Sequence, residues 1–167
     1  MKKLPLLFFC IIFLFCGCSD SPKAPVENFS AEISTSLNGI KIKAYIISNA
    51  NDFIVIKMKS PECMNGYTYS YKDGNFKISY KNFNIDADGS YLPNTSFAEI
   101  IYNVIRSIKK EGNCIYQGEY NSFAEYKGNC DSGMYTLTTD FSTGLIKEIS
   151  LKENKFKAKL KKIKEIN

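Results

Sequence analysis

Histidine is absent from the 167 residues, and its absence removes the chemistry that most often serves hydrolases and metalloenzymes. A Ser-His or Cys-His catalytic pair, a histidine-bound metal ion and an imidazole general base are all excluded. The carboxylates are scattered along the chain without an identifiable pair, and no glycine-rich phosphate loop, C-x-x-C or G-x-S-x-G motif occurs. We therefore expect no catalytic residues, no metal site and no cofactor.

The reactive side chains that remain are six cysteines, and the most specific pattern surrounds Cys18. Lys2 and Lys3 precede an apolar stretch, residues 4–17, which is shorter than the roughly 20 residues that span a bilayer. Such a stretch is typical of a secretory signal. The segment Leu14-Phe15-Cys16-Gly17-Cys18 resembles a bacterial lipobox, with a small residue just before the modified cysteine.

The lipobox predicts that residues 1–17 are a signal peptide and that Cys18 becomes a lipidated N-terminus, carrying a diacylglyceryl group with acyl chains such as palmitate. Each buried CH₂ contributes about 0.8 kcal/mol, so two or three chains hold a protein firmly on a membrane. We expect residues 18–27 to form a polar tether and residues 28–167 one domain, anchored on the extracytoplasmic side of the cell membrane. The alternative is an ordinary secretory signal with a chance cysteine.

Three further cysteines belong to the predicted domain. Cys114 and Cys130 each end a Gly-Asn-Cys triplet and flank a predicted hairpin, and an exported protein can meet oxidising conditions. They are therefore a possible disulfide. Cys63 is expected to be a small buried residue, because no histidine is available to activate it as a nucleophile.

The charge pattern argues against a nucleic-acid partner. Of the 22 basic residues only Arg106 is an arginine. Residues 152–167 hold seven lysines against two glutamates, a net charge of +5. One interpretation is a solvated edge strand on which lysines discourage aggregation, and the other is attraction to anionic lipid headgroups beside the anchor.

Alternation of apolar and polar residues predicts a mostly β protein. About ten strands are expected, at 29–37, 40–46, 53–58, 67–71, 76–80, 114–119, 123–129, 133–140, 144–151 and 155–161. One helix is expected over residues 96–111, because Ser96 and Glu99 have capping-box spacing and apolar residues then recur at helical spacing. This pattern favours a curved antiparallel sheet, an unclosed β-barrel, wrapped over one principal helix.

Residues 84–89 resemble the opening of an EF-hand calcium loop, with oxygen-bearing side chains at alternate positions and a glycine at the sixth. The twelfth position is Thr95, where a bidentate glutamate is required. We therefore expect an Asp-Gly turn here and no calcium site.

The order of several short segments resembles the LolA/LppX superfamily of bacterial lipoproteins and lipoprotein carriers. The segments are Phe29-Ser30-Ala31, Lys59-Ser60-Pro61 with Gly66, Leu92-Pro93 before the capped helix, and the stretches 133–140 and 141–149. The resemblance implies a half-barrel with helices over its concave side, often with a hydrophobic cavity between them. Members bind acyl chains or lipidated proteins, or serve as protein-binding modules, and the resemblance does not imply an enzyme.

Two functional hypotheses follow. The first is a non-catalytic lipoprotein that binds a lipid or other hydrophobic ligand in a groove between sheet and helix. The candidate ligand-binding residues are Met58, Met64, Tyr67, Tyr69, Ile101, Val104, Ile105 and Ile108, although the same residues would serve equally well as ordinary core. The second is a protein–protein module that holds a cell-envelope partner, such as an enzyme of the spore-cortex amidase type, as germination lipoproteins do.

Overall fold

The computed structural model describes residues 21–49, 53–72, 74–88, 92–93 and 95–166. The predicted signal peptide and Cys18 lie outside these residues. The strands are β1 (Phe29–Leu37), β2 (Ile40–Ser48), β3 (Ile54–Ser60), β4 (Thr68–Lys72), β5 (Asn75–Tyr80), β6 (Phe83–Asp88), β7 (Cys114–Tyr120), β8 (Phe123–Cys130), β9 (Gly133–Asp140), β10 (Ile146–Leu151) and β11 (Phe156–Glu165). The described helices are the short 3-10 turn η1 (Glu62–Met64) and α2 (Phe97–Ile108).

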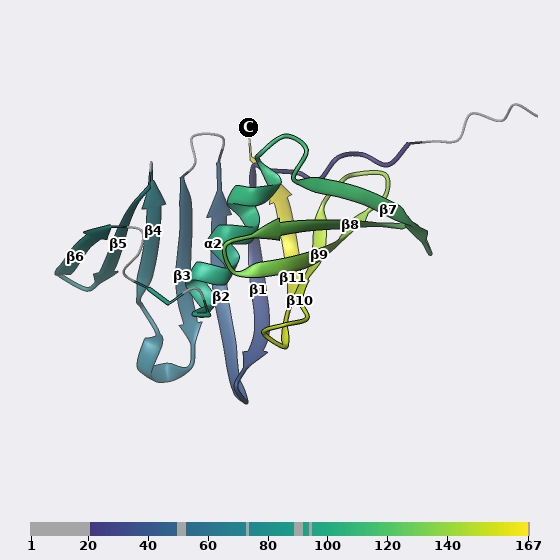
Figure 1. The fold of residues 1–167 in the computed structure, drawn as a ribbon. Helices are drawn as coiled ribbons and strands as arrows, with labels where there is room; N and C mark the ends of the chain where they lie inside the picture. The colour runs from purple at the N-terminus through teal and green to yellow at the C-terminus, as the bar shows by residue number, and fades with distance from the viewer. Residues whose placement is uncertain (1–20, 50–52, 73, 89–91, 94, 167) are drawn as a thin grey trace, which may run out of the picture.

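All the strands belong to one antiparallel sheet, in the order β6-β5-β4-β3-β2-β1-β11-β10-β9-β8-β7. The first and last strands of the chain, β1 and β11, pair at its centre, and β6 and β7 are its two edges. The sheet curves, so that α2 lies in front of the central strands while β8 and β9 cross that side of the molecule (Figure 1). The predicted fold class is confirmed: a mostly β, unclosed antiparallel sheet around one helix.

Tight turns set the register of the sheet. Asn38 and Gly39 adopt φ values of 51° and 80°, which is the left-handed geometry that a two-residue hairpin requires. The pairing of Leu37 with Ile40 follows from it.

The sequence prediction omitted β6, because residues 84–89 were interpreted as a turn. Phe83 and Ile85 in fact alternate with polar residues and pair with Tyr80 and Ile78 of β5.

The helix begins where its capping pattern predicts. The Ser96 hydroxyl accepts a hydrogen bond from the Glu99 amide at 3.4 Å, and this satisfies one of the free amides of the first turn. The helix ends at Ile108, three residues before the predicted end, with Lys109 as its C-cap. The Lys109 ammonium donates to the carbonyl of Asn49, in the connection after β2, and this contact ties the end of the helix to the sheet.

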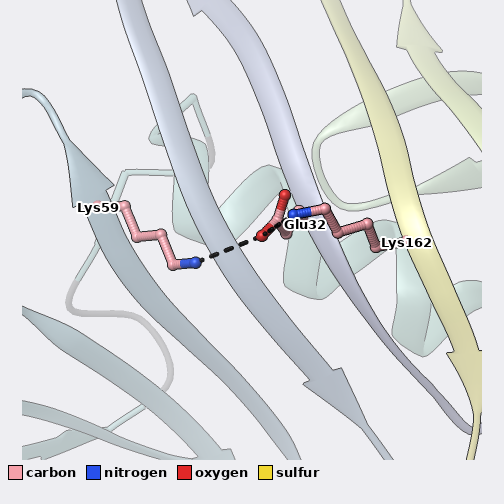
Figure 2. Close-up of polar contacts among 3 residues, drawn as sticks. All are labelled: Glu32, Lys59 and Lys162. Carbon is pink, nitrogen blue, oxygen red and sulfur yellow. Dashed lines mark hydrogen bonds and ion pairs between the residues drawn. The ribbon is translucent and has the colours of Figure 1, made fainter.

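The lysine-rich β11 is a central strand, so the prediction that it lies at an edge was wrong. It pairs with β1 on one side and β10 on the other, and its lysines alternate with the buried Phe156, Ala158 and Leu160. Glu32 of β1 forms ion pairs with a lysine of β11 and a lysine of β3 (Figure 2). One of its carboxylate oxygens lies 3.1 Å from Lys162 Nζ and 3.6 Å from Lys59 Nζ. The hydrogen bond from Lys162 lowers the pKa of Glu32.

The segment before β1 is bound to the domain, whereas the sequence predicted a tether as far as residue 27. Lys23 N donates to Phe141 O and Val26 N donates to Gly144 O, both at 3.0 Å. Val26 is 8% exposed and belongs to the hydrophobic core. Gly144 has a φ of 71°, and a Cβ there would collide with the carbonyl oxygen of Ala24. The folded unit therefore begins several residues earlier than predicted.

Removing this segment should destabilise the domain. A chain that starts at Asn28 loses the burial of Val26 and two backbone hydrogen bonds that a chain starting at Ser21 retains. We expect the shorter chain to have a free energy of unfolding lower by roughly 2–4 kcal/mol, measured by urea denaturation. Equal midpoints and slopes for the two chains would show that the segment is not docked in solution.

Candidate functional site

The helix α2 is buried on almost every side. Of its twelve residues only Arg106 is exposed. Its apolar side chains Ile100, Ile101 and Val104 have no measurable exposure, and Ile105 is 1% exposed. The Tyr102 ring stacks on Tyr71 of β4 with the ring centroids 4.0 Å apart. The helix is therefore enclosed by the curved sheet and is not a lid lying on it.

A line of polar residues on α2 is buried together with the apolar ones. Glu99, Asn103 and Ser107 lie four residues apart and so share one face of the helix. Each reaches a partner in the sheet: Tyr71 OH donates to Glu99 Oε2 at 3.1 Å, Asn103 Nδ2 donates to Ser132 Oγ at 3.0 Å, and Ser107 Oγ donates to the carbonyl of Asn129 at 2.8 Å. We call these three residues the polar row. It connects α2 to β4 and to the β8–β9 hairpin.

Glu99 is the ionisable residue of the polar row, and its burial changes its pKa. Glu99 is 4% exposed, and burial raises the pKa of its carboxyl group. Hydrogen bonds from Tyr71 and Asn103 oppose the rise, the charge of Asp131 adds to it, and Arg106 opposes it. Burial and the neighbouring Glu99 also raise the pKa of Tyr71. The Tyr71–Glu99 pair is thus a buried contact that links the helix to β4.

The groove that the sequence predicted between sheet and helix is filled in the described part of the chain. Six of the eight candidate ligand-binding residues are core side chains exposed by 9% or less: Met58, Tyr69, Ile101, Val104, Ile105 and Ile108. Met64 and Tyr67 are partly buried at the margin of the same core. None of the eight lines any of four pockets found among the described residues. The structure therefore uses these residues for packing.

One apolar surface is left uncovered at the β6 end of the sheet. Phe83 is 75% exposed and Ile85 51%, and their cross-strand partners Tyr80 and Ile78 are half-buried. Tyr67 stacks on Tyr80 with the ring centroids 4.5 Å apart. We call these five residues the aromatic wing. Register places them on the sheet face that carries the buried Tyr71 and Phe76, where β5 and β6 extend beyond the helix (Figure 1).

The strands expected at 67–71 and 76–80 include Tyr67, Ile78 and Tyr80, but the sequence analysis placed no strand at Phe83 and Ile85. The period-two alternation of residues 83–88 was the signal that could have placed them, since Asn84 and Asp86 separate the apolar positions. The likeness of the same residues to a calcium loop concealed it. The rest of that loop, residues 89–91 and 94, lies outside the described residues.

Four surface pockets are found among the described residues. One of about 570 Å³ lies over β8 to β11, and apolar side chains, among them Met134, Leu151 and Phe156, line it together with Thr136, Ser150 and four lysines. Two of those lysines, Lys127 and Lys157, already pair with Glu125 and Glu148 at 3.7 and 2.7 Å. The described residues contain no group of three or more metal-ligating side chains, and none of their helices is long and apolar enough to cross a membrane.

The predicted disulfide is not formed. Cys114 and Cys130 are free thiols in the structure, because the register pairs Cys114 with Gly128, two residues away from Cys130. Diagonal partners of this kind lie about 7–8 Å apart, beyond the usual reach of a disulfide. Burial raises the pKa of both thiols. Cys63, expected to be buried, is exposed on η1.

No protein-family model matches the sequence, and no curated protein matches it. Among solved structures, an uncharacterised conserved protein from Thermus thermophilus aligns with a TM-score of 0.54 at 9% identity, covering 83% of this chain and 78% of its own. That likeness supports the fold alone.

Two further solved structures align more weakly. A LolA superfamily protein from Nitrosomonas europaea aligns with a TM-score of 0.46 at 11% identity, covering 86% of this chain and 88% of its own. The Clostridioides difficile GerS lipoprotein, solved in complex with the CwlD amidase, aligns with a TM-score of 0.44 at 12% identity, covering 100% and 94%. TM-scores below 0.5 support no statement about function.

Glu99 should make stability depend on pH. Its raised pKa means that the unfolded chain ionises first as the pH rises above the ordinary value of 4.5, so the folded state loses stability between that value and the raised pKa. Glu99→Gln keeps an acceptor for Tyr71 but cannot ionise. Glu32 and Asp140, whose pKa values are lowered, act in the opposite direction in both proteins. We therefore expect the urea midpoint to fall further, or rise less, from about pH 4 to about pH 8 in the wild type than in the variant. An unchanged pH dependence would place a titrating group elsewhere.

The three cysteines of the domain should differ in the rate at which a thiol reagent labels them. In a chain that starts at Ser21, Cys63 is exposed, whereas Cys114 and Cys130 are half-buried with raised pKa values. Because the thiolate is the reacting form, we expect one thiol to react rapidly with a maleimide at neutral pH and two to react many-fold more slowly. Digestion and mass spectrometry identify the fast site. Three equal rates, or a single reactive thiol with the other two oxidised to each other, would contradict the structure.

Proposed function

We propose that this chain is a membrane-anchored, non-catalytic protein-docking module of the bacterial cell envelope, and that the aromatic wing is its docking surface. The proposal depends chiefly on one observation: the space between α2 and the sheet is filled, while an apolar surface at one end of the sheet is open. A lipid carrier needs the opposite arrangement. The localisation rests on the lipobox-like sequence that ends at Cys18.

A groove for an acyl chain would require α2 to move away from the sheet. Each fully buried isoleucine of the helix contributes about 1.5–3 kcal/mol through burial, and the polar row would lose its partners at about 1–3 kcal/mol for each group left unsatisfied. None of the eight candidate ligand-binding residues lines any of the four pockets described above. We therefore favour a protein partner over a lipid ligand.

The aromatic wing has the composition of a docking surface. Two tyrosines, a phenylalanine and two isoleucines form it, and aromatic residues are enriched at the centres of protein interfaces. The adjoining strand β6 is an edge of the described sheet, so its outer backbone groups can pair with a strand of a partner. Apolar side chains and an edge strand together offer both contact area and directional hydrogen bonds.

The partner class to test first is a cell-wall enzyme of the amidase type, because germination lipoproteins that support such enzymes are similar in fold, an argument by analogy. No residue of the described chain is assigned a catalytic role in this proposal. The chain would act by holding or positioning the enzyme at the membrane surface.

A site-specific photo-crosslinker tests the docking surface. Placed at Phe83 in the full chain in its own host, it should form an adduct with one envelope protein. The matched control places it at Lys159, which is also exposed but lies on the opposite face of the central strand β11. We expect several-fold more adduct from position 83, and a loss of that adduct when Ile85→Asp is added.

Equal adducts from both positions, or an adduct unaffected by Ile85→Asp, would contradict docking at the aromatic wing. Adducts with phospholipid alone would contradict the choice of a protein partner. Because Phe83 and Ile85 are exposed and contribute little to the core, neither substitution should impair folding.

A further inference from the structure

The docked segment before β1 fixes the place where the chain leaves the domain. Lys23 is held twice, because its amide donates to Phe141 O at 3.0 Å and its carbonyl accepts from Tyr126 OH at 3.1 Å. Phe141 lies in the turn after β9, and its own amide donates to Ser122 O, in the β7–β8 turn, at 3.0 Å. The N-terminal segment and these two turns therefore meet at one corner of the molecule, on the side where β7 ends and β8 begins (Figure 1).

This corner carries exposed aromatic side chains that the core does not use. Tyr120 is 77% exposed and Phe123 39%, and the two are cross-strand partners at the end of the β7–β8 hairpin. Phe141 is half-buried beside them. We call Tyr120, Phe123 and Phe141 the anchor corner. It lies by the sheet edge opposite to the edge that bears the aromatic wing.

Chain length limits how far the anchor corner can stand from a membrane. Cys18 is only three residues before Ser21, the first described residue, and three extended residues span at most about 11 Å. The geometry points to the bilayer interface as the surface that the anchor corner contacts, with Tyr120 and Phe123 at the level of the lipid headgroups. This inference rests on the proposed acylation of Cys18.

The chemistry of the corner fits an interfacial contact and not an electrostatic one. Tyrosine is enriched at the membrane–water boundary, because its ring can contact lipid while its hydroxyl group contacts water. Glu119 adjoins Tyr120, and Asp140, paired with Phe123 in the sheet, keeps a lowered pKa through hydrogen bonds from Thr143. The exposed Lys23 also lies at the corner, so its positive charge is set against the carboxylates of Glu119 and Asp140. The corner therefore has no excess of positive charge that would require anionic lipid, and the contact should form equally on neutral membranes.

The contact would orient the whole domain. With the β7 edge at the membrane, the β6 edge and its aromatic wing lie at the far end of the sheet, where an envelope protein can reach them. The short connection and the aromatic contact thus act together to present the docking surface.

Tryptophan fluorescence tests this inference cleanly, because the natural chain contains no tryptophan. Tyr120→Trp and, as the matched control, Phe83→Trp each place one probe at an exposed aromatic position. The full mature protein is reconstituted in phosphatidylcholine vesicles, with and without phosphatidylglycerol, and brominated lipids serve as quenchers. We expect a blue shift and several-fold stronger quenching for Tyr120→Trp, the same on both vesicle types. Phe123→Trp provides a second probe of the same corner.

Equal quenching of Tyr120→Trp and Phe83→Trp would overturn the fixed orientation, and absence of quenching from both would show that the domain stands away from the bilayer. Quenching that requires phosphatidylglycerol would overturn the apolar contact in favour of an electrostatic one. The intact mass of the mature protein shows whether Cys18 is acylated, and so distinguishes failure of the anchoring proposal from failure of this inference. An unacylated Cys18 removes the anchor and this inference together, whereas an acylated but unquenched protein removes this inference alone.

Discussion

The three polar side chains of α2 must each find a partner inside the sheet, and the rest of the structure depends on that requirement. Glu99, Asn103 and Ser107 are 4–5% exposed, and a buried polar group without a hydrogen bond costs about 1–3 kcal/mol. Their partners come from β4 at one side and from the β8–β9 hairpin at the other. The curved sheet supplies all three partners, and their hydrogen bonds hold the polar face of the helix against β4 and the β8–β9 hairpin.

Enclosing the helix determines which surfaces are available for function. The interior holds the apolar face of α2, so the inner side of the half-barrel offers no groove among the described residues. What remains are the two ends of the sheet, and they differ. The β6 end presents the aromatic wing, and the β7 end lies beside the point where the chain leaves toward Cys18. This arrangement is the reason that we propose an anchored module with one end at the membrane and the other free for a partner.

Local patterns predicted most of the fold, and tertiary contacts account for what they missed. Alternation located ten of the eleven strands, the Asn38-Gly39 turn and the Ser96 cap, because each of these depends on neighbours in sequence. The central place of β11 could not be inferred, since its pairing with β1 joins residues more than a hundred positions apart. The docking of Lys23 and Val26 is equally non-local. For the site, the apolar stripe of α2 was found correctly, but only its packing shows that it serves the core and not a ligand. Phe83 and Ile85 were missed because residues 84–89 were interpreted as a turn, although apolar and polar residues alternate over 83–88.

The central claim is that the half-barrel is filled, and native mass spectrometry of the domain tests it most directly. A chain of residues 21–167, purified from its own host without detergent, should give the mass of the polypeptide alone, and added fatty acid or phospholipid should not bind stoichiometrically. A retained species of lipid mass, lost when Val104 or Ile101 is replaced by a larger side chain, would show an open groove along α2 and would contradict the account.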